Sequence, residues 1–166
     1  WSSLVGSEMC IRDRFIDYLQ ALFFKVFGQN FQVYIFHASI VNCLLTIITF
    51  YILKNFNLNI YQCFLYSICF ATLGYTTSGT LYVDHHSSLL CLLAVFCLIM
   101  AIKTERRKFL ILLPIILGLA FLTKSAPSVY VFFSVSLILI LYIFIEKKFN
   151  WLLYLFLSSI SFIILT

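Results

Sequence analysis

Charged residues are scarce in this chain. Asp, Glu, Lys and Arg make up 10% of its 166 residues, against about 25% in soluble domains. The chain also has only 2 Pro and 5 Gly, which excludes a long flexible or proline-rich linker. What it has instead is 63% hydrophobic residues, with 19 Phe and 10 Tyr. This composition excludes a water-soluble globular domain and indicates an integral membrane protein.

Motifs of soluble enzymes are missing from the sequence as well. It contains no P-loop, GxSxG, HExxH or dinucleotide-binding fingerprint. The net charge of +5 comes from basic residues in short turns rather than from one patch, so nucleic acid is not expected as a partner. The cysteines form no CxxC pair and most lie in apolar runs, so neither a disulfide framework nor a zinc site is expected. They are Cys10, Cys43, Cys63, Cys69, Cys91 and Cys97.

Long uncharged runs organise the rest of the chain. They cover residues 33–53, 55–83, 85–102, 109–123, 125–145 and 149–166. Because a helix needs about 20 apolar residues to cross a hydrocarbon core of about 30 Å, we predict an all-α, polytopic transmembrane bundle with five to six crossings. Residues 15–28 mix aromatics at helical spacing with polar residues, which predicts an amphipathic helix in the membrane interface that ends at Gly28.

The two ends of the chain differ from a normal domain boundary. Residues 1–14, "WSSLVGSEMCIRDR", resemble the translated read-through of a sequencing adapter. We therefore expect residues 1–14 to be a non-native leader and residues 15–166 to be one partial transmembrane domain. The last apolar run stops at Thr166 without a polar flank, so the bundle is expected to be incomplete at both ends.

The distribution of charge predicts an orientation. Basic residues occupy alternate turns, at Lys54, in "KTERRK" (residues 103–108) and in "EKK" (residues 146–148). By the positive-inside rule these turns are cytoplasmic. Asp84 and Lys124 then share the opposite, non-cytoplasmic face. Frequent Asn, Lys, Ile and Phe hint at an AT-rich bacterial genome, so we expect an inner (plasma) membrane protein with its site on the periplasmic or extracellular side.

The stretch "TLYVDHHSSLL", residues 80–90, holds the first group of candidate functional residues. Asp84 has two candidate roles, general base toward an acceptor and ligand of a divalent cation, and its alternative is an ordinary turn residue. His85 and His86 diverge by about 100° on a helix, so one metal would not take both easily; His85 is the candidate ligand beside Asp84. Tyr82 and His86 are expected near substrate or metal.

Lys124 is the second candidate. The preceding run, residues 109–123, has only 15 residues, about 22 Å of helix at about 1.5 Å per residue, so Lys124 is expected near the outer membrane edge. There it could bind a phosphate or anionic headgroup, or only anchor the helix. His37, within the run 33–53, is expected to be a packing histidine more often than a functional one.

The order of these motifs resembles a known superfamily. "FGQN", "GTLYVDHH", the basic turn and "GLAFLTKSAP" together look like the GT-C membrane glycosyltransferases. The likeness is greatest to the family 39 branch, with protein O-mannosyltransferases and lipid A aminoarabinose transferases, and covers about residues 17–145. It implies a GT-C-like helical bundle and a polyprenyl-phosphate sugar as donor. The acceptor would be a lipid, glycan or protein of unknown identity, and membrane lipid would be a partner.

The resemblance also implies residue roles. Asp84 matches the outer-loop Asp near the donor phosphate and metal, although His85 stands where Pro is common, and Asp-His-His resembles a metal-using motif of archaeal oligosaccharyltransferases. Lys124 matches the Lys that meets the donor phosphate, with Ser125 where Gly is frequent. His37 is the nearest equivalent of an early Arg. The family's principal catalytic carboxylate would lie before Phe15, so the supplied segment alone is expected to be inactive.

Two other functions remain open from the sequence. In a transporter or channel, Asp84, His85, His86 and Lys124 would form an ion or proton path, but few mid-membrane polar residues or broken helices support one. In a non-catalytic membrane scaffold, the outer charges would be incidental. Loss of sugar transfer in Asp84→Asn and Lys124→Ala variants that still fold would favour the glycosyltransferase over both.

Overall fold

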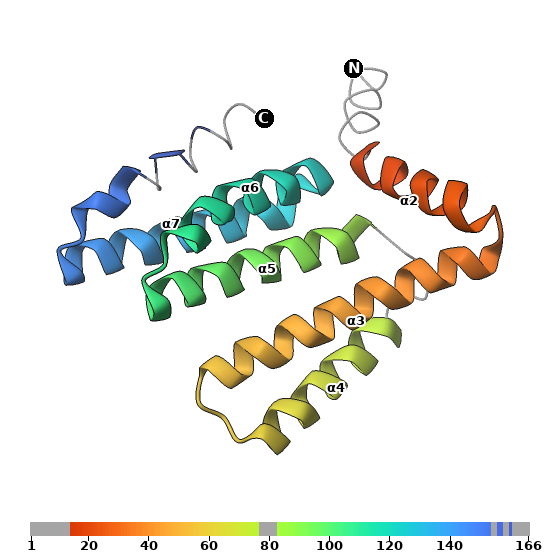
Figure 1. Ribbon diagram of the computed structural model, residues 1–166, viewed down its shortest axis with the longest axis horizontal. Helices are drawn as coiled ribbons and strands as arrows, with labels where there is room; N and C mark the ends of the chain where they lie inside the picture. Colours follow the sequence, from red (N-terminus) through yellow and green to blue (C-terminus); the bar gives the residue numbers. More distant parts are fainter. Residues whose placement is uncertain (1–13, 77–82, 154–155, 158–159, 161–166) are drawn as a thin grey trace.

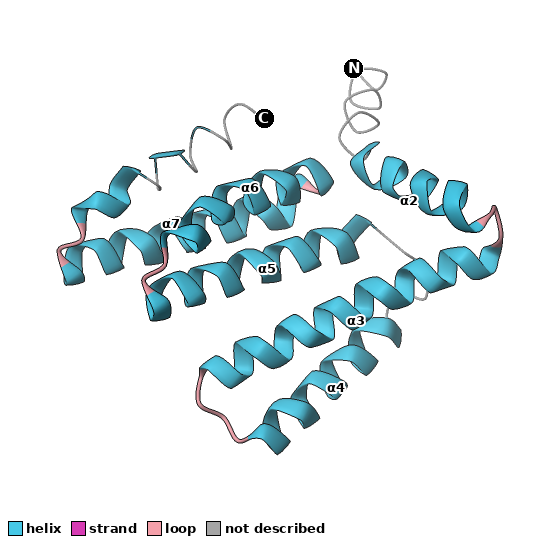
Figure 2. Ribbon diagram, viewed as in Figure 1, coloured by secondary structure: helices cyan, strands magenta, loops and turns pink. Residues whose placement is uncertain are grey.

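A computed structural model describes residues 14–76, 83–153, 156–157 and 160. Within these residues every regular element is helical, as Figure 2 shows. The elements are α2 (Arg14–Phe27), α3 (Phe31–Asn55), α4 (Ile60–Thr76), α5 (Val83–Thr104), α6 (Arg107–Thr123), α7 (Ser125–Glu146) and the short 3-10 helix η1 (Phe149–Trp151). The predicted all-α class is confirmed.

The helix boundaries follow the predicted runs closely. The amphipathic segment forms α2 and stops at Gly28, whose φ of +92° is easy for glycine and strained for other residues. The predicted apolar run 55–83 contains α4, which is described as far as Thr76, and residues 77–82 lie outside the described part. Asp84, predicted to mark a turn or helix end, is the second residue of α5.

Three described helices are long and apolar enough to cross a membrane, and they lie within α3, α5 and α7. α4 and α6 have 17 residues each, which gives about 25 Å of helix at about 1.5 Å per residue. α6 still connects α5 to α7 and packs along both. These elements form a helical membrane bundle.

The core of the bundle lies between α5, α6 and α7, which Figure 1 shows side by side. On α5 the buried positions Ala94, Cys97, Leu98 and Ala101 follow the i, i+3, i+4, i+7 spacing of one helix face. Three of these side chains are small, which lets the backbone of α6 approach closely, as is usual in membrane bundles.

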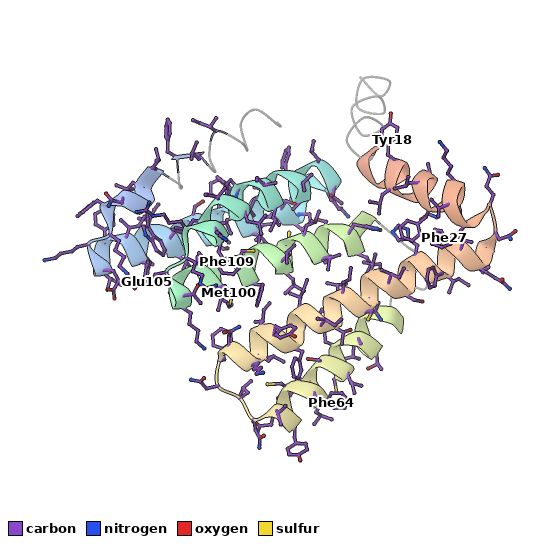
Figure 3. All side chains as sticks on the ribbon, viewed as in Figure 1. Tyr18, Phe27, Phe64, Met100, Glu105 and Phe109 are labelled. Atoms are coloured by element: carbon purple, nitrogen blue, oxygen red, sulfur yellow. The ribbon has the colours of Figure 1, made fainter. Side chains whose placement is uncertain are left out.

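The other helices pack against this group through α3. α3 contacts α4 on one side and α5 on the other, and α2 lies across its N-terminal part (Figure 1). α2 leaves Tyr18, Leu22 and Val26 exposed by 70%, 58% and 66% of their surface. Figure 3 shows Tyr18 on the side of α2 away from α3. The side of α2 that faces the bundle is formed by Gln20 and Phe23, both of which contact α3.

Candidate functional site

The N-terminal end of α5 is held from two directions. Its side chains at positions 86 and 87 are both buried, with 6% of His86 and none of Ser87 exposed. Neighbouring residues on a helix point about 100° apart, so the two side chains reach different partners. His86 contacts α3, and Ser87 contacts α7.

His86 meets a second buried histidine. Its Nε2 atom lies 3.3 Å from Nε2 of His37 on α3, and the two rings are 5.1 Å apart in an edge-on arrangement. His37 is 1% exposed. Its Nδ1 atom lies 2.5 Å from Oε1 of Gln20 on α2, and Phe23 stacks on its ring with centroids 4.2 Å apart. We call Gln20, His37 and His86 the histidine relay; it connects α2, α3 and α5.

Ser87 leads to the turn that carries Lys124. The Oγ of Ser128 on α7 donates a hydrogen bond to the carbonyl oxygen of Lys124 at 2.7 Å. Since a serine hydroxyl has one hydrogen, Ser87 is the donor in the 3.4 Å contact between the two serine Oγ atoms. The Sγ of Cys91 lies 4.0 Å from the same Ser128 oxygen. The start of α5 and the backbone of Lys124 are thus joined through two buried hydroxyls.

Lys124 is the single residue between α6 and α7. Its backbone is extended (φ −154°, ψ 123°), and its N–H donates to the carbonyl of Ala120 at 3.1 Å. The preceding Thr123 is fully buried, and its hydroxyl donates back to Leu119 at 2.8 Å. The Lys124 side chain is partly buried. The serine contacts bring Lys124 to the same end of the bundle as the start of α5, and the membrane face on which that end lies stays a prediction.

Of the other predicted site residues, the structure describes the side chain of His85 but not those of Asp84 and Tyr82. His85 is partly exposed, at the third position of α5. The side chain of Asp84, and the whole of Tyr82, lie outside the described part of the structure. Asp84 precedes Ser87 by three residues in the first turns of α5.

The predicted metal ligands stay a prediction. Among the residues that the structure describes, no group of three His, Cys, Asp or Glu side chains comes together as a metal site. His86 is turned toward His37, and the predicted role of His85 beside Asp84 stays a prediction.

The basic turns gather at the opposite end of the bundle. Lys103 at the end of α5 donates to the carbonyl of Asn55 at the end of α3, at 3.3 Å. Lys148, after α7, forms a 2.5 Å ion pair with Glu105 in the α5–α6 turn. Its hydrogen bond to Glu105 is the main reason that the pKa of Lys148 lies above its ordinary value. Figure 3 labels Glu105 at this end, far from Tyr18 on α2.

Sequence reasoning missed the histidine relay. Gln20 was one polar residue among several in an amphipathic helix, and His37 was expected to be a packing residue. The sequence held one weak signal, since Gln20 and Phe23 are three residues apart and therefore share a face of α2. Nothing in the sequence says that this face meets His37, because the contact depends on how α2 folds back at Gly28.

These features define a class. The chain is an integral membrane protein built as a helical bundle, with basic turns at one end and a cluster of histidine, serine and lysine residues at the other. The model of one protein family, described as dolichyl-phosphate-mannose-protein mannosyltransferase, matches residues 14–165, and the chain belongs to this family. It is therefore a membrane glycosyltransferase of the GT-C type, and a transporter segment is not its class. Comparison with curated proteins and with solved structures gives no match.

Proposed function

We propose that this protein transfers a sugar from a polyprenyl-phosphate donor to an acceptor on the non-cytoplasmic face of a bacterial inner membrane. The observation that carries the proposal is the contact of Ser87, Ser128 and the Lys124 carbonyl. It brings the helix turn of Asp84 and the turn of Lys124 to one end of the bundle. The basic turns lie at the other end, and by the positive-inside rule that end is cytoplasmic.

The proposed chemistry is a displacement at the anomeric carbon of the sugar. An acceptor oxygen attacks this carbon, and the bond from the carbon to the phosphate oxygen breaks, with inversion. The electron pair of that bond goes to the leaving polyprenyl phosphate, and the acceptor proton goes to a base. Asp84 is the carboxylate proposed as this base.

Lys124 is proposed to bind the phosphate of the donor. Charge builds up on the leaving phosphate as the bond breaks, and a fixed cation in a water-poor site stabilises that charge more than water would. Lysine serves this purpose as a compact point charge. A divalent cation held by Asp84 and His85 would supply the same stabilisation, and these two residues are the ones that would hold it.

A transfer assay tests the proposal. Membranes containing the full-length protein receive a radiolabelled polyprenyl-phosphate sugar, and label in the acceptor fraction is counted. We expect Asp84→Asn to lower the turnover about 100-fold or more, as losing a general base does, while the protein still folds and inserts. Lys54→Ala is the matched control for Lys124→Ala, because Lys54 is an exposed lysine at the basic end. Full activity in both Asp84→Asn and Lys124→Ala would reject the proposal.

A further inference from the structure

The donors and acceptors of the histidine relay can be assigned in order along its hydrogen bonds. The Oε1 atom of Gln20 is a carbonyl oxygen and only accepts hydrogen bonds, so Nδ1 of His37, 2.5 Å away, carries the hydrogen. A neutral imidazole has one N–H, which leaves a lone pair on Nε2 of His37. The Nε2 atom of His86, 3.3 Å from that lone pair, must then be the donor. The structure thus assigns opposite tautomers to the two rings.

The histidine relay lies in an apolar part of the bundle, where burying polar groups costs free energy. His37 is the seventh residue of the 25-residue apolar helix α3, and both of its ring nitrogens are occupied within the protein. The relay is not fully paired, because Nε2 of Gln20 is buried and has no hydrogen-bond partner in the described part of the structure, and a partly satisfied set of buried polar groups is costly. A phenylalanine pair would pack α2, α3 and α5 at lower cost. Unlike apolar packing, the hydrogen bonds of the histidine relay give a contact with a defined direction.

The directional contact acts on the rotation of α5. His86 is hydrogen-bonded toward α3, and Ser87, about 100° further around the helix, is hydrogen-bonded toward α7. Two contacts at different angles prevent the first turn of the helix from rotating about its axis. That turn contains Asp84 and His85. Displacing a reacting group by about 1 Å costs about 100-fold in rate, so the setting of this turn matters for catalysis.

We propose that Gln20 and His37 are positioning residues for sugar transfer, which act through His86 on the turn that carries Asp84 and His85. The inference rests on the proposed function. Neither residue touches the reacting atoms: Gln20 orients His37, and His37 fixes His86. α2 is thereby a working part of the site, although it lies outside the α5–α6–α7 core.

The first test measures the tautomers without any activity. The full-length protein, labelled with ¹⁵N-histidine in lipid nanodiscs, is examined by NMR, and His37→Asn and His86→Asn variants assign the rings. We expect His37 protonated at Nδ1, His86 protonated at Nε2, and a scalar coupling across the Nε2–Nε2 hydrogen bond. In Gln20→Met, which removes the acceptor at similar size, the coupling should disappear. Two identical tautomers, or a coupling that survives Gln20→Met, would overturn the relay.

The second test separates positioning from folding. Gln20→Met is expected to lower kcat about tenfold, the effect of one hydrogen bond, with the KM for the donor within about twofold. Gln20→Glu keeps an oxygen acceptor and is expected to restore kcat. Gln32→Met makes the same chemical change at an exposed position of α3 and should leave kcat unchanged. A merely structural role would lower the amount of folded protein and leave kcat per folded molecule unchanged.

The outcomes distinguish the two proposals. Suppose that the wild-type protein transfers sugar, and that Gln20→Met abolishes the scalar coupling between His37 and His86 but leaves kcat unchanged. The positioning role is then wrong and the proposed function stands. If the wild-type protein transfers no sugar from a polyprenyl-phosphate donor, the proposed function falls and the positioning role falls with it. The tautomer assignment is judged by NMR in either case.

Discussion

Ser87 on α5 and Ser128 on α7 face each other with 3.4 Å between their Oγ atoms, and Ser128 donates its hydrogen to the carbonyl of Lys124. Both side chains are fully buried. The pair is the structural reason why two motifs 40 residues apart in sequence, at Asp84 and at Lys124, meet at one end of the bundle. The contact between Ser87 and Ser128 connects the two motifs physically, through the carbonyl of Lys124.

The serine pair gives a prediction for stability. Ser128→Ala removes the partner of the Lys124 carbonyl and of Ser87, and Ser87→Ala removes the other side of the contact. We expect a double-mutant cycle of the two to show a coupling of about 0.6 kcal/mol, the usual size between membrane helices. Reversible unfolding in mixed micelles measures it. Ser134→Ala is the matched control on α7, because Ser134 is exposed and its hydroxyl donates back to the carbonyl of Tyr130 in the same helix. Zero coupling between Ser87 and Ser128 would contradict the contact.

The ion pair at the basic end predicts a pH effect. The hydrogen bond to Glu105 raises the pKa of Lys148, so the contribution of the pair is complete below the unfolded pKa of lysine, about 10.4. It is lost as the pH rises through the higher folded value. We expect Glu105→Gln to lower the pKa of Lys148, measured by NMR of ¹³C-dimethylated lysines. Glu146→Gln, a neighbouring exposed carboxylate, should not. Equal shifts in the two variants would show that Glu105 is not the partner.

The exposed face of α2 predicts contact with lipid. Tyr18, Leu22 and Val26 are exposed along one side of the helix, and Gln29 is exposed in the turn that follows it. In a background without exposed native cysteines, a spin label at Leu22→Cys should be more accessible to oxygen than to a water-soluble nickel complex. A label at Gln29→Cys should show the reverse preference. If both labels prefer the nickel complex, α2 does not lie in the membrane interface.

Much of the fold could be predicted from the sequence because hydrophobic runs and turn residues are local signals. The ends of α3, α5, α6 and α7 fall within two residues of the predicted runs on average, and Gly28 ends α2 as expected. The common end of the Asp84 and Lys124 turns followed from counting the crossings between them. Both conclusions depend only on which residues are apolar and on the fact that helices alternate in direction.

The histidine relay could not be predicted in the same way. His37, His86 and Gln20 are separated by 49 and 17 residues, and no periodic pattern connects them. Their contact depends on the rotation of α3 and α5 about their axes. Rotation about a helix axis changes no hydropathy run, so the sequence pattern carries little information about it.

The central claim is that the donor phosphate is held at the end of the bundle that carries Lys124. Binding of a short-chain prenyl-phosphate sugar to the full-length protein in nanodiscs, measured by calorimetry, tests this most directly. We predict that Lys124→Ala raises the Kd about tenfold or more, the loss of about one charge-assisted contact, and that Lys54→Ala leaves the Kd unchanged. Equal Kd values for the wild-type protein and Lys124→Ala, or weaker binding only in Lys54→Ala, would contradict the account.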